Sequence, residues 1–84
     1  ETAAEQTEVA FERIREVLKA ARMDFADVVR FDVYFTDRAD LPAFVAIRDR
    51  VMGAHKPGAT FIVVAGLARP ELKIEIEAVA AKVD

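Results

Sequence analysis

The sequence contains no cysteine, no serine and no tryptophan. Without cysteine the chain can form neither disulfides nor thiolate metal sites, a composition that fits a cytoplasmic protein. Histidine occurs once, at His55, in a loop marked by Pro57 and Gly58. With no second histidine to share a metal ion and no serine to activate, His55 is interpreted as a loop residue rather than a catalyst, and no metal site is predicted.

Long apolar runs and basic clusters are also missing. No apolar run reaches the ~20 residues that a membrane-spanning helix needs, so no membrane association is predicted. The net charge is -3, and the positive residues are scattered among acidic ones. Because nucleic-acid binding relies on clustered positive charge to neutralise phosphates, a nucleic-acid partner is disfavoured.

What is present is a short, mostly apolar chain. Its 84 residues are 54% hydrophobic and 32% charged, which predicts one domain over residues 1–84 with a modest core. Hydrophobic burial leaves little margin of stability at this size. We therefore expect a partner subunit to contribute to it.

Two amphipathic helices are predicted. The first runs from Thr2 to about Arg22 and opens with a capping box formed by Thr2 and Glu5. Its apolar stripe, with Phe11 at the border, comprises Ala10, Ile14, Val17, Leu18 and Ala21. The second runs from a capping Asp40 to about Met52, where Gly53 supplies a left-handed stop. Its core-facing residues are Phe44, Ile47 and Val51.

Three strands are predicted, over Val28–Thr36, Thr60–Ala65 and Lys73–Ala80. In the first strand, the alternation predicts that one face meets the core; its residues are Val29, Phe31, Val33 and Phe35. The second is apolar on both faces, so we expect it to be central or covered by another subunit. The element order of helix, strand, helix, strand, strand indicates an α+β fold with two helices packed on one face of the sheet.

The last strand separates apolar from charged side chains with period two. Its apolar face carries Ile74, Ile76, Ala78 and Ala80, and its other face carries Lys73, Glu75, Glu77 and Val79. The charged face must meet water, a partner subunit or a ligand. Two interpretations stay open: solubilising glutamates on a half-exposed strand, or a functional surface.

Several stretches, taken in order, resemble the RidA (YjgF) family, also known as the endoribonuclease L-PSP or reactive intermediate imine deaminase family. They are Asp27–Asp37, His55–Pro57, Ile74–Ala78 and the opening helix around Glu5–Thr7. The resemblance implies a chorismate-mutase-like mixed sheet with two helices on one face. It also implies a homotrimer with small-molecule clefts between subunits, hydrolysis of enamines or imines to keto compounds and ammonia, and no cofactor.

The resemblance also implies site residues. In the family, the first glutamate of the final strand positions or activates water, and Glu75 matches it as the catalytic residue. The resemblance assigns ligand binding to Ala59, Thr60 and Phe61. Ala59 stands where the family has an arginine that binds the substrate carboxylate, and alanine offers no charged hydrogen bond to replace it. The 84 residues also lack the family's amino-terminal hairpin, so we expect either a fragment of a longer protein or an incomplete cleft.

Two functions of different classes remain. The first is an imine or enamine deaminase in which Glu75 handles water and a group other than Ala59 holds the substrate. The second is a non-catalytic trimer that binds a metabolite or a protein partner, with Glu75 and Glu77 as interface or surface residues. Action on nucleic acid ranks third, because the chain is acidic.

Overall fold

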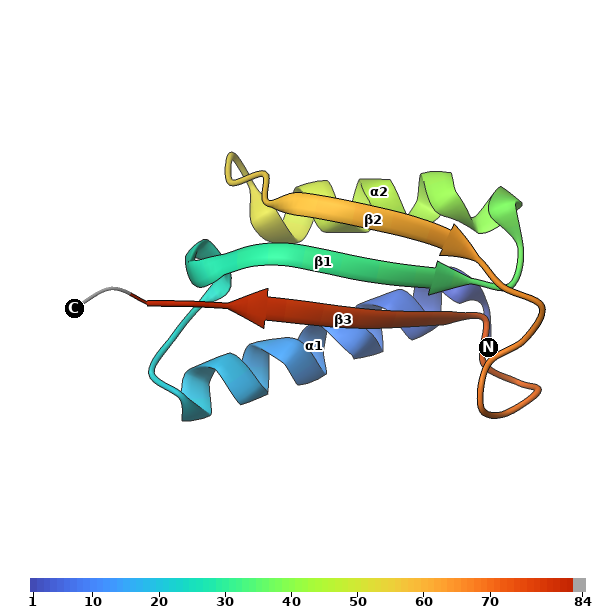
Figure 1. The fold of residues 1–84 in the computed structure, drawn as a ribbon, viewed down its shortest axis with the longest axis horizontal. Helices are drawn as coiled ribbons and strands as arrows, with labels where there is room; N and C mark the ends of the chain where they lie inside the picture. The colour runs from blue at the N-terminus through green and yellow to red at the C-terminus, as the bar shows by residue number, and fades with distance from the viewer. Residues whose placement is uncertain (83–84) are drawn as a thin grey trace.

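The computed structural model describes residues 1–82 (Figure 1). In chain order the elements are α1 (Ala3–Ala20), the 3-10 helix η1 (Phe25–Asp27), β1 (Val28–Phe35), the 3-10 helix η2 (Arg38–Asp40), α2 (Leu41–Met52), β2 (Gly58–Val63) and β3 (Ile74–Ala80). This order is the predicted one. Within the described part of the chain, no helix is both long and apolar enough to cross a membrane.

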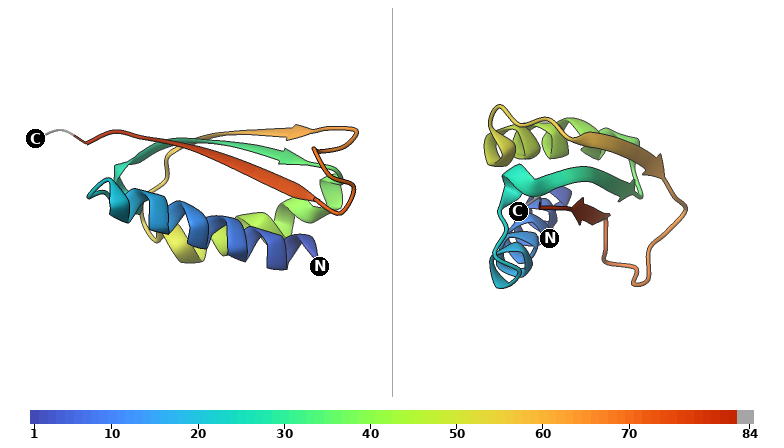
Figure 2. Two further views of the ribbon diagram at one scale, coloured as in Figure 1. Left: turned by 90° about the horizontal axis from the view of Figure 1, so that it is seen from below. Right: turned by 60° about the vertical axis from the view of Figure 1, so that its left-hand side comes forward.

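The three strands form one mixed sheet in the order β2-β1-β3. β1 pairs with β2 in parallel and with β3 in antiparallel orientation. A parallel pair needs a crossover connection, which α2 provides, and α1 and α2 lie on the same side of the sheet (Figure 2). The predicted α+β fold is confirmed. We call the opposite side, which no helix covers in residues 1–82, the open face.

The start of α1 follows the predicted capping box. The Thr2 hydroxyl accepts from the backbone N–H of Glu5 at 3.1 Å, and the Glu5 carboxylate accepts from that of Thr2 at 2.8 Å. The predicted apolar stripe holds for Leu18, which is buried, and for Ile14, which packs against the core, but the other buried residues of α1 are Ala3, Thr7 and Phe11. Val17 is 70% exposed. The helix is rotated so that Phe11, expected at the border, points into the core.

Aromatic rings join the two layers. The Phe11 ring centroid lies 5.7 Å from that of Phe31 in β1 and 5.8 Å from that of Phe44 in α2. Phe44 also packs edge-on against Phe35, at 5.8 Å. Such pairs add about 0.5–1.5 kcal/mol each beyond the burial of their area. One aromatic cluster therefore holds both helices against β1.

A bulge lies near the start of β1. Val28 pairs with Ala80 and Arg30 pairs with Val79, which leaves Val29 as an extra residue on β1. An extra residue reverses the alternation of faces. Val28 is therefore fully buried and Val29 is 52% exposed, so the prediction that Val29 faces the core is wrong. The predicted alternation holds beyond the bulge for Phe31, Val33 and Phe35.

The second helix begins differently from the prediction. The side chain of Asp40 makes no capping hydrogen bond, because η2 already precedes α2. Instead the Asp37 carboxylate accepts from the backbone N–H of Ala39 at 2.9 Å and caps η2. Gly53 ends α2 with a φ of +61°, as predicted for a residue without a Cβ.

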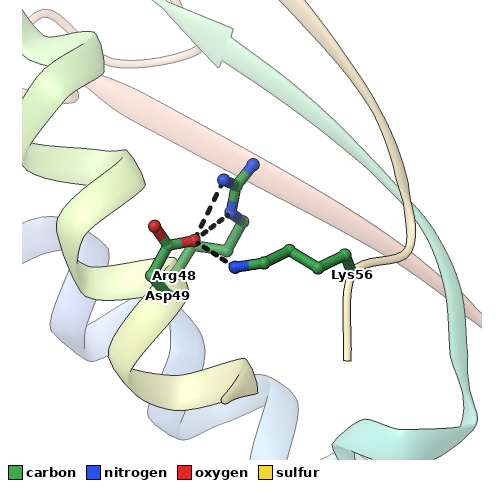
Figure 3. Close-up of polar contacts among 3 residues, drawn as sticks. All are labelled: Arg48, Asp49 and Lys56. Carbon is green, nitrogen blue, oxygen red and sulfur yellow. Dashed lines mark hydrogen bonds and ion pairs between the residues drawn. The ribbon is translucent and has the colours of Figure 1, made fainter. Parts of the chain in front are cut away.

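Two polar contacts hold the loop between α2 and β2. The Nε2 atom of His55 lies 2.7 Å from the carbonyl oxygen of Val28, at the bulge. Lys56 and Arg48 both donate to Asp49, at 3.2 and 3.0 Å (Figure 3). Hydrogen bonds from Arg48 and then Lys56 lower the pKa of Asp49. His55 is thus a structural loop residue, and it ties the segment leading into β2 to β1.

β2 lies at an edge of this sheet, so the prediction of a central strand is wrong for the single chain. All six of its residues, Gly58–Val63, are exposed. The alternative, that another subunit covers this strand, stays a prediction.

The bulge makes a matched pair of valines with opposite expected effects. Val33→Ala should lower the free energy of unfolding by about 2 kcal/mol, because Val33 is fully buried and its truncation leaves a cavity. Val29→Ala should change it by less than ~0.5 kcal/mol. Urea denaturation of both variants measures the difference. Equal losses would show that β1 has no bulge and that Val29 packs in the core.

Candidate functional site

The open face presents three rows of side chains, set by the strand register. One row is Glu75, Tyr34 and Ile62; the next is Glu77, Asp32 and Thr60; the third is Val79, Arg30 and Gly58. Residues paired across neighbouring strands point to the same face of a sheet. The face is therefore polar over β3 and β1 and becomes apolar at Ile62.

Tyr34 lies at the centre of the acidic side chains. Hydrogen bonding with the Glu77 carboxylate, followed by its negative charge, raises the pKa of Tyr34, and Asp32 and Glu75 add to the effect. A phenolate at this position would be repelled by three carboxylates. Arg30 offsets part of that charge, because it pairs with Asp32 at 3.3 Å. Tyr34 is therefore a neutral hydrogen-bonding group among acidic side chains.

Glu75 and Thr60 are both exposed on the open face, and for Glu75 this agrees with the predicted alternation of its strand. They lie on opposite sides of β1, so about 10 Å separates their strands, at ~4.8 Å for each pairing. The Glu75 carboxylate is free to meet solvent or a ligand. No ion pair involving Glu75 occurs among residues 1–82.

Ala59 and Phe61 lie on the opposite side of the sheet from Glu75. Their partners in β1 are Phe31 and Val33, whose side chains face the helices. The Phe61 ring packs against Phe44 at 5.7 Å, so it borders the aromatic core. Within one chain, the structure therefore brings Glu75 and Thr60 to a common face and does not bring Ala59 or Phe61 there.

A hollow at the end of the sheet was not expected from the sequence. It has a volume of about 440 Å³ and lies where β1 ends and the segment from β2 to β3 turns back. Its lining comprises Thr36, Ala65, Gly66, Leu67, Ala68, Arg69, Pro70, Leu72 and Lys73. The sequence predicts a turn here from Arg69 and Pro70, but only the folded loop encloses a space.

The side chains within residues 1–82 offer little to a metal ion. No group of three or more histidine or carboxylate side chains in that range is placed to hold one. The acidic residues around Tyr34 are spread along the strands instead of converging on one point. The chemistry available on the open face is that of a carboxylate, a phenol and nearby cations.

The arrangement of two helices on one side of a mixed sheet defines the class, an α+β protein with one open face. The sequence matches the family Endoribonuclease L-PSP over residues 1–82. The chain therefore belongs to this family, whose solved relatives include YjgF and Rid proteins.

Individual relatives agree with that assignment. The protein DfrA of Myxococcus xanthus is 32% identical over 75 residues, which are 89% of this chain and 56% of DfrA. A YjgF/YER057c/UK114 family member from Mycobacterium tuberculosis is 34% identical, with a TM-score of 0.88 over 92% of this chain and 65% of its own. YyfB of Yersinia pestis, a Rid protein, is 38% identical, with a TM-score of 0.86 over 96% of this chain and 63% of its own.

The chain thus spans just over half of the curated relative and less than two thirds of these solved chains. The fold of the matched part is shared. Activity, substrates and assembly of a whole protein of this family remain matters of proposal for this chain.

The single tyrosine gives a direct test of the electrostatics. Tyr34 should titrate above its ordinary pKa of about 10, and Glu77→Gln should move its pKa back down, because the hydrogen bond to a charged carboxylate is replaced by one to a neutral amide and the repelling charge is lost. The ultraviolet absorbance of tyrosinate reports on Tyr34 alone, since the chain has one tyrosine and no tryptophan.

The matched control is Glu12→Gln, a carboxylate exposed on α1 that pairs with Arg15. It should leave the titration of Tyr34 unchanged. A wild-type pKa at or below the ordinary value would contradict the geometry of the open face.

Proposed function

We propose that this chain hydrolyses reactive imines or enamines to keto compounds and ammonia, with Glu75 as the catalytic residue. The observation that carries the proposal is the exposed Glu75 carboxylate on the open face of an Endoribonuclease L-PSP family fold. The position matches the glutamate that handles water in the family it resembles.

The reaction needs little from the protein. A water molecule adds its oxygen to the imine carbon to give a carbinolamine, and the C–N bond then breaks to release ammonia and leave a carbonyl group. A carboxylate within hydrogen-bond reach of that water can take its proton and later return it to the leaving nitrogen. Neither step requires a metal ion or an organic cofactor.

A homotrimer is part of the proposal. Apolar side chains remain exposed on β2 and on the open face, among them Ile62 at 40%, Val63 at 54% and Val79 at 45%. Covering them stabilises an assembly by roughly 25 cal/mol for each Å² removed from water. Subunits that meet through these residues would place a small-molecule site between chains, where Thr60 and Ala59 at the edge strand could approach Glu75 of a neighbour.

A second function is favoured by one observation. Ala59 carries no charge to bind a carboxylate substrate, so the trimer could bind a small molecule or a protein without turnover. In that case Glu75 and Glu77 are interface or surface residues, and changing them alters binding or assembly alone.

Turnover separates the two functions. With freshly generated iminoalanine as the substrate, the wild type should speed the release of pyruvate and ammonia, and Glu75→Gln should lower the rate at least about a hundredfold, a typical share for a general base. Glu12→Gln on α1 is the matched control and should retain the wild-type rate. If the wild type does not speed the hydrolysis of iminoalanine, the deaminase proposal is refuted and the non-catalytic function remains.

Assembly has its own test. Light scattering should give a mass three times the 9.3 kDa of one chain at micromolar concentration. Ile62→Glu should reduce that mass, because it buries an unpaired charge at the subunit contact. Ala46→Glu, on the exposed side of α2, should not. A monomeric wild type would refute the trimer.

A further inference from the structure

We propose that the hollow lined by Thr36, Arg69 and Lys73 binds a small monoanionic carboxylate and supplies the positive charge that Ala59 lacks. The identity of the ligand, an imino or keto acid, rests on the function proposed above. The site itself rests on the contents of the hollow and its place beside Glu75.

Three of the residues that line the hollow have side chains that can donate to an anion. Arg69 and Lys73 bring two positive charges, and Thr36 brings a hydroxyl. In the described chain, the backbone N–H groups of residues 65–69 donate no hydrogen bond to protein. Charged donors and free amides together are the groups that carboxylates bind most strongly. The volume of about 440 Å³ suits a small metabolite.

Hydrogen bonds hold the walls of the hollow in place. The side chain of Gln6 in α1 donates to the carbonyl of Glu71 at 2.9 Å and accepts from the backbone N–H of Lys73 at 2.7 Å. The N–H of Thr36 donates to the carbonyl of Lys73 at 3.1 Å. Because the ends of the loop are anchored before a ligand arrives, less ordering is needed on binding.

Neighbouring carboxylates set the charge of the ligand. Glu71 lies 3.5 Å from Nε of Arg69. The pKa of Glu5 is lowered first by its hydrogen bonds with Thr2, and the charge of Lys73 adds a smaller effect. Glu75 follows Lys73 by two residues. With these negative groups around two cations, a monoanion is accommodated, whereas a phosphate dianion meets more repulsion. The balance therefore favours a carboxylate over phosphate.

The position of the hollow relative to Glu75 links binding to chemistry. Lys73 directly precedes β3, and Glu75 follows it by two positions, a step of roughly 7 Å along an extended chain. In an imino or keto acid, the reactive carbon is bonded directly to the carboxylate. A carboxylate held by Lys73 therefore keeps the reactive carbon near the end of β3 that carries Glu75.

Calorimetry with pyruvate at low ionic strength tests the site. Wild type should bind pyruvate, and Lys73→Gln and Arg69→Gln should each raise the Kd about tenfold, because each removes one charged donor. Lys73→Arg should restore most of the affinity. Lys19→Gln, on the exposed surface of α1, is the matched control and should bind as the wild type does. Inorganic phosphate should compete weakly.

Each further result has one meaning. The site is overturned if wild type binds no pyruvate, if both glutamine variants bind it as tightly as wild type, or if phosphate binds more tightly. Circular dichroism must show each variant folded. If pyruvate binding depends on Lys73 but the protein does not hydrolyse imines, the site is supported and the proposed function is refuted. If the protein hydrolyses imines and Lys73→Gln and Arg69→Gln leave the KM unchanged, the proposed function is supported and the site is refuted.

Discussion

The contact of Phe11 with Phe31 and Phe44 decides which face of the sheet stays open. Ring centroids 5.7 and 5.8 Å apart place α1 against β1 on the side that α2 also occupies. Strand side chains alternate, so the residues between the buried ones must point the other way. Tyr34 on β1 and Glu75 on β3 reach the open face for this reason, and the register then sets them side by side.

Local patterns in the sequence were enough to predict much of this arrangement. The capping box of Thr2 and Glu5, the stop at Gly53 and the two faces of β3 depend on residues a few positions apart, and the structure agrees with each. The exposure of Glu75 follows from the same alternation. The order of elements then left an α+β sheet with two helices on one side as the natural fold.

Features that depend on distant residues were not predictable in the same way. The bulge at Val29 arises from pairing with β3, and nothing in the alternation of Val28–Thr36 marks one extra residue. The rotation of α1 toward Phe11 depends on aromatic partners in β1 and α2. The hollow forms because Gln6, more than 60 residues away, anchors the loop at Glu71 and Lys73.

In the candidate site, too, some features depend on residues close in sequence and others on distant pairing. The side of β3 that carries Glu75 follows from local alternation, while the sides of Thr60 and Ala59 depend on the parallel pairing with Asp32 and Phe31. A crystal structure with bound pyruvate tests the account most directly. It should show the pyruvate carboxylate against Lys73 and Arg69, with the carbonyl carbon turned toward Glu75. Pyruvate bound away from Glu75, with its carboxylate held by other residues, would contradict the account.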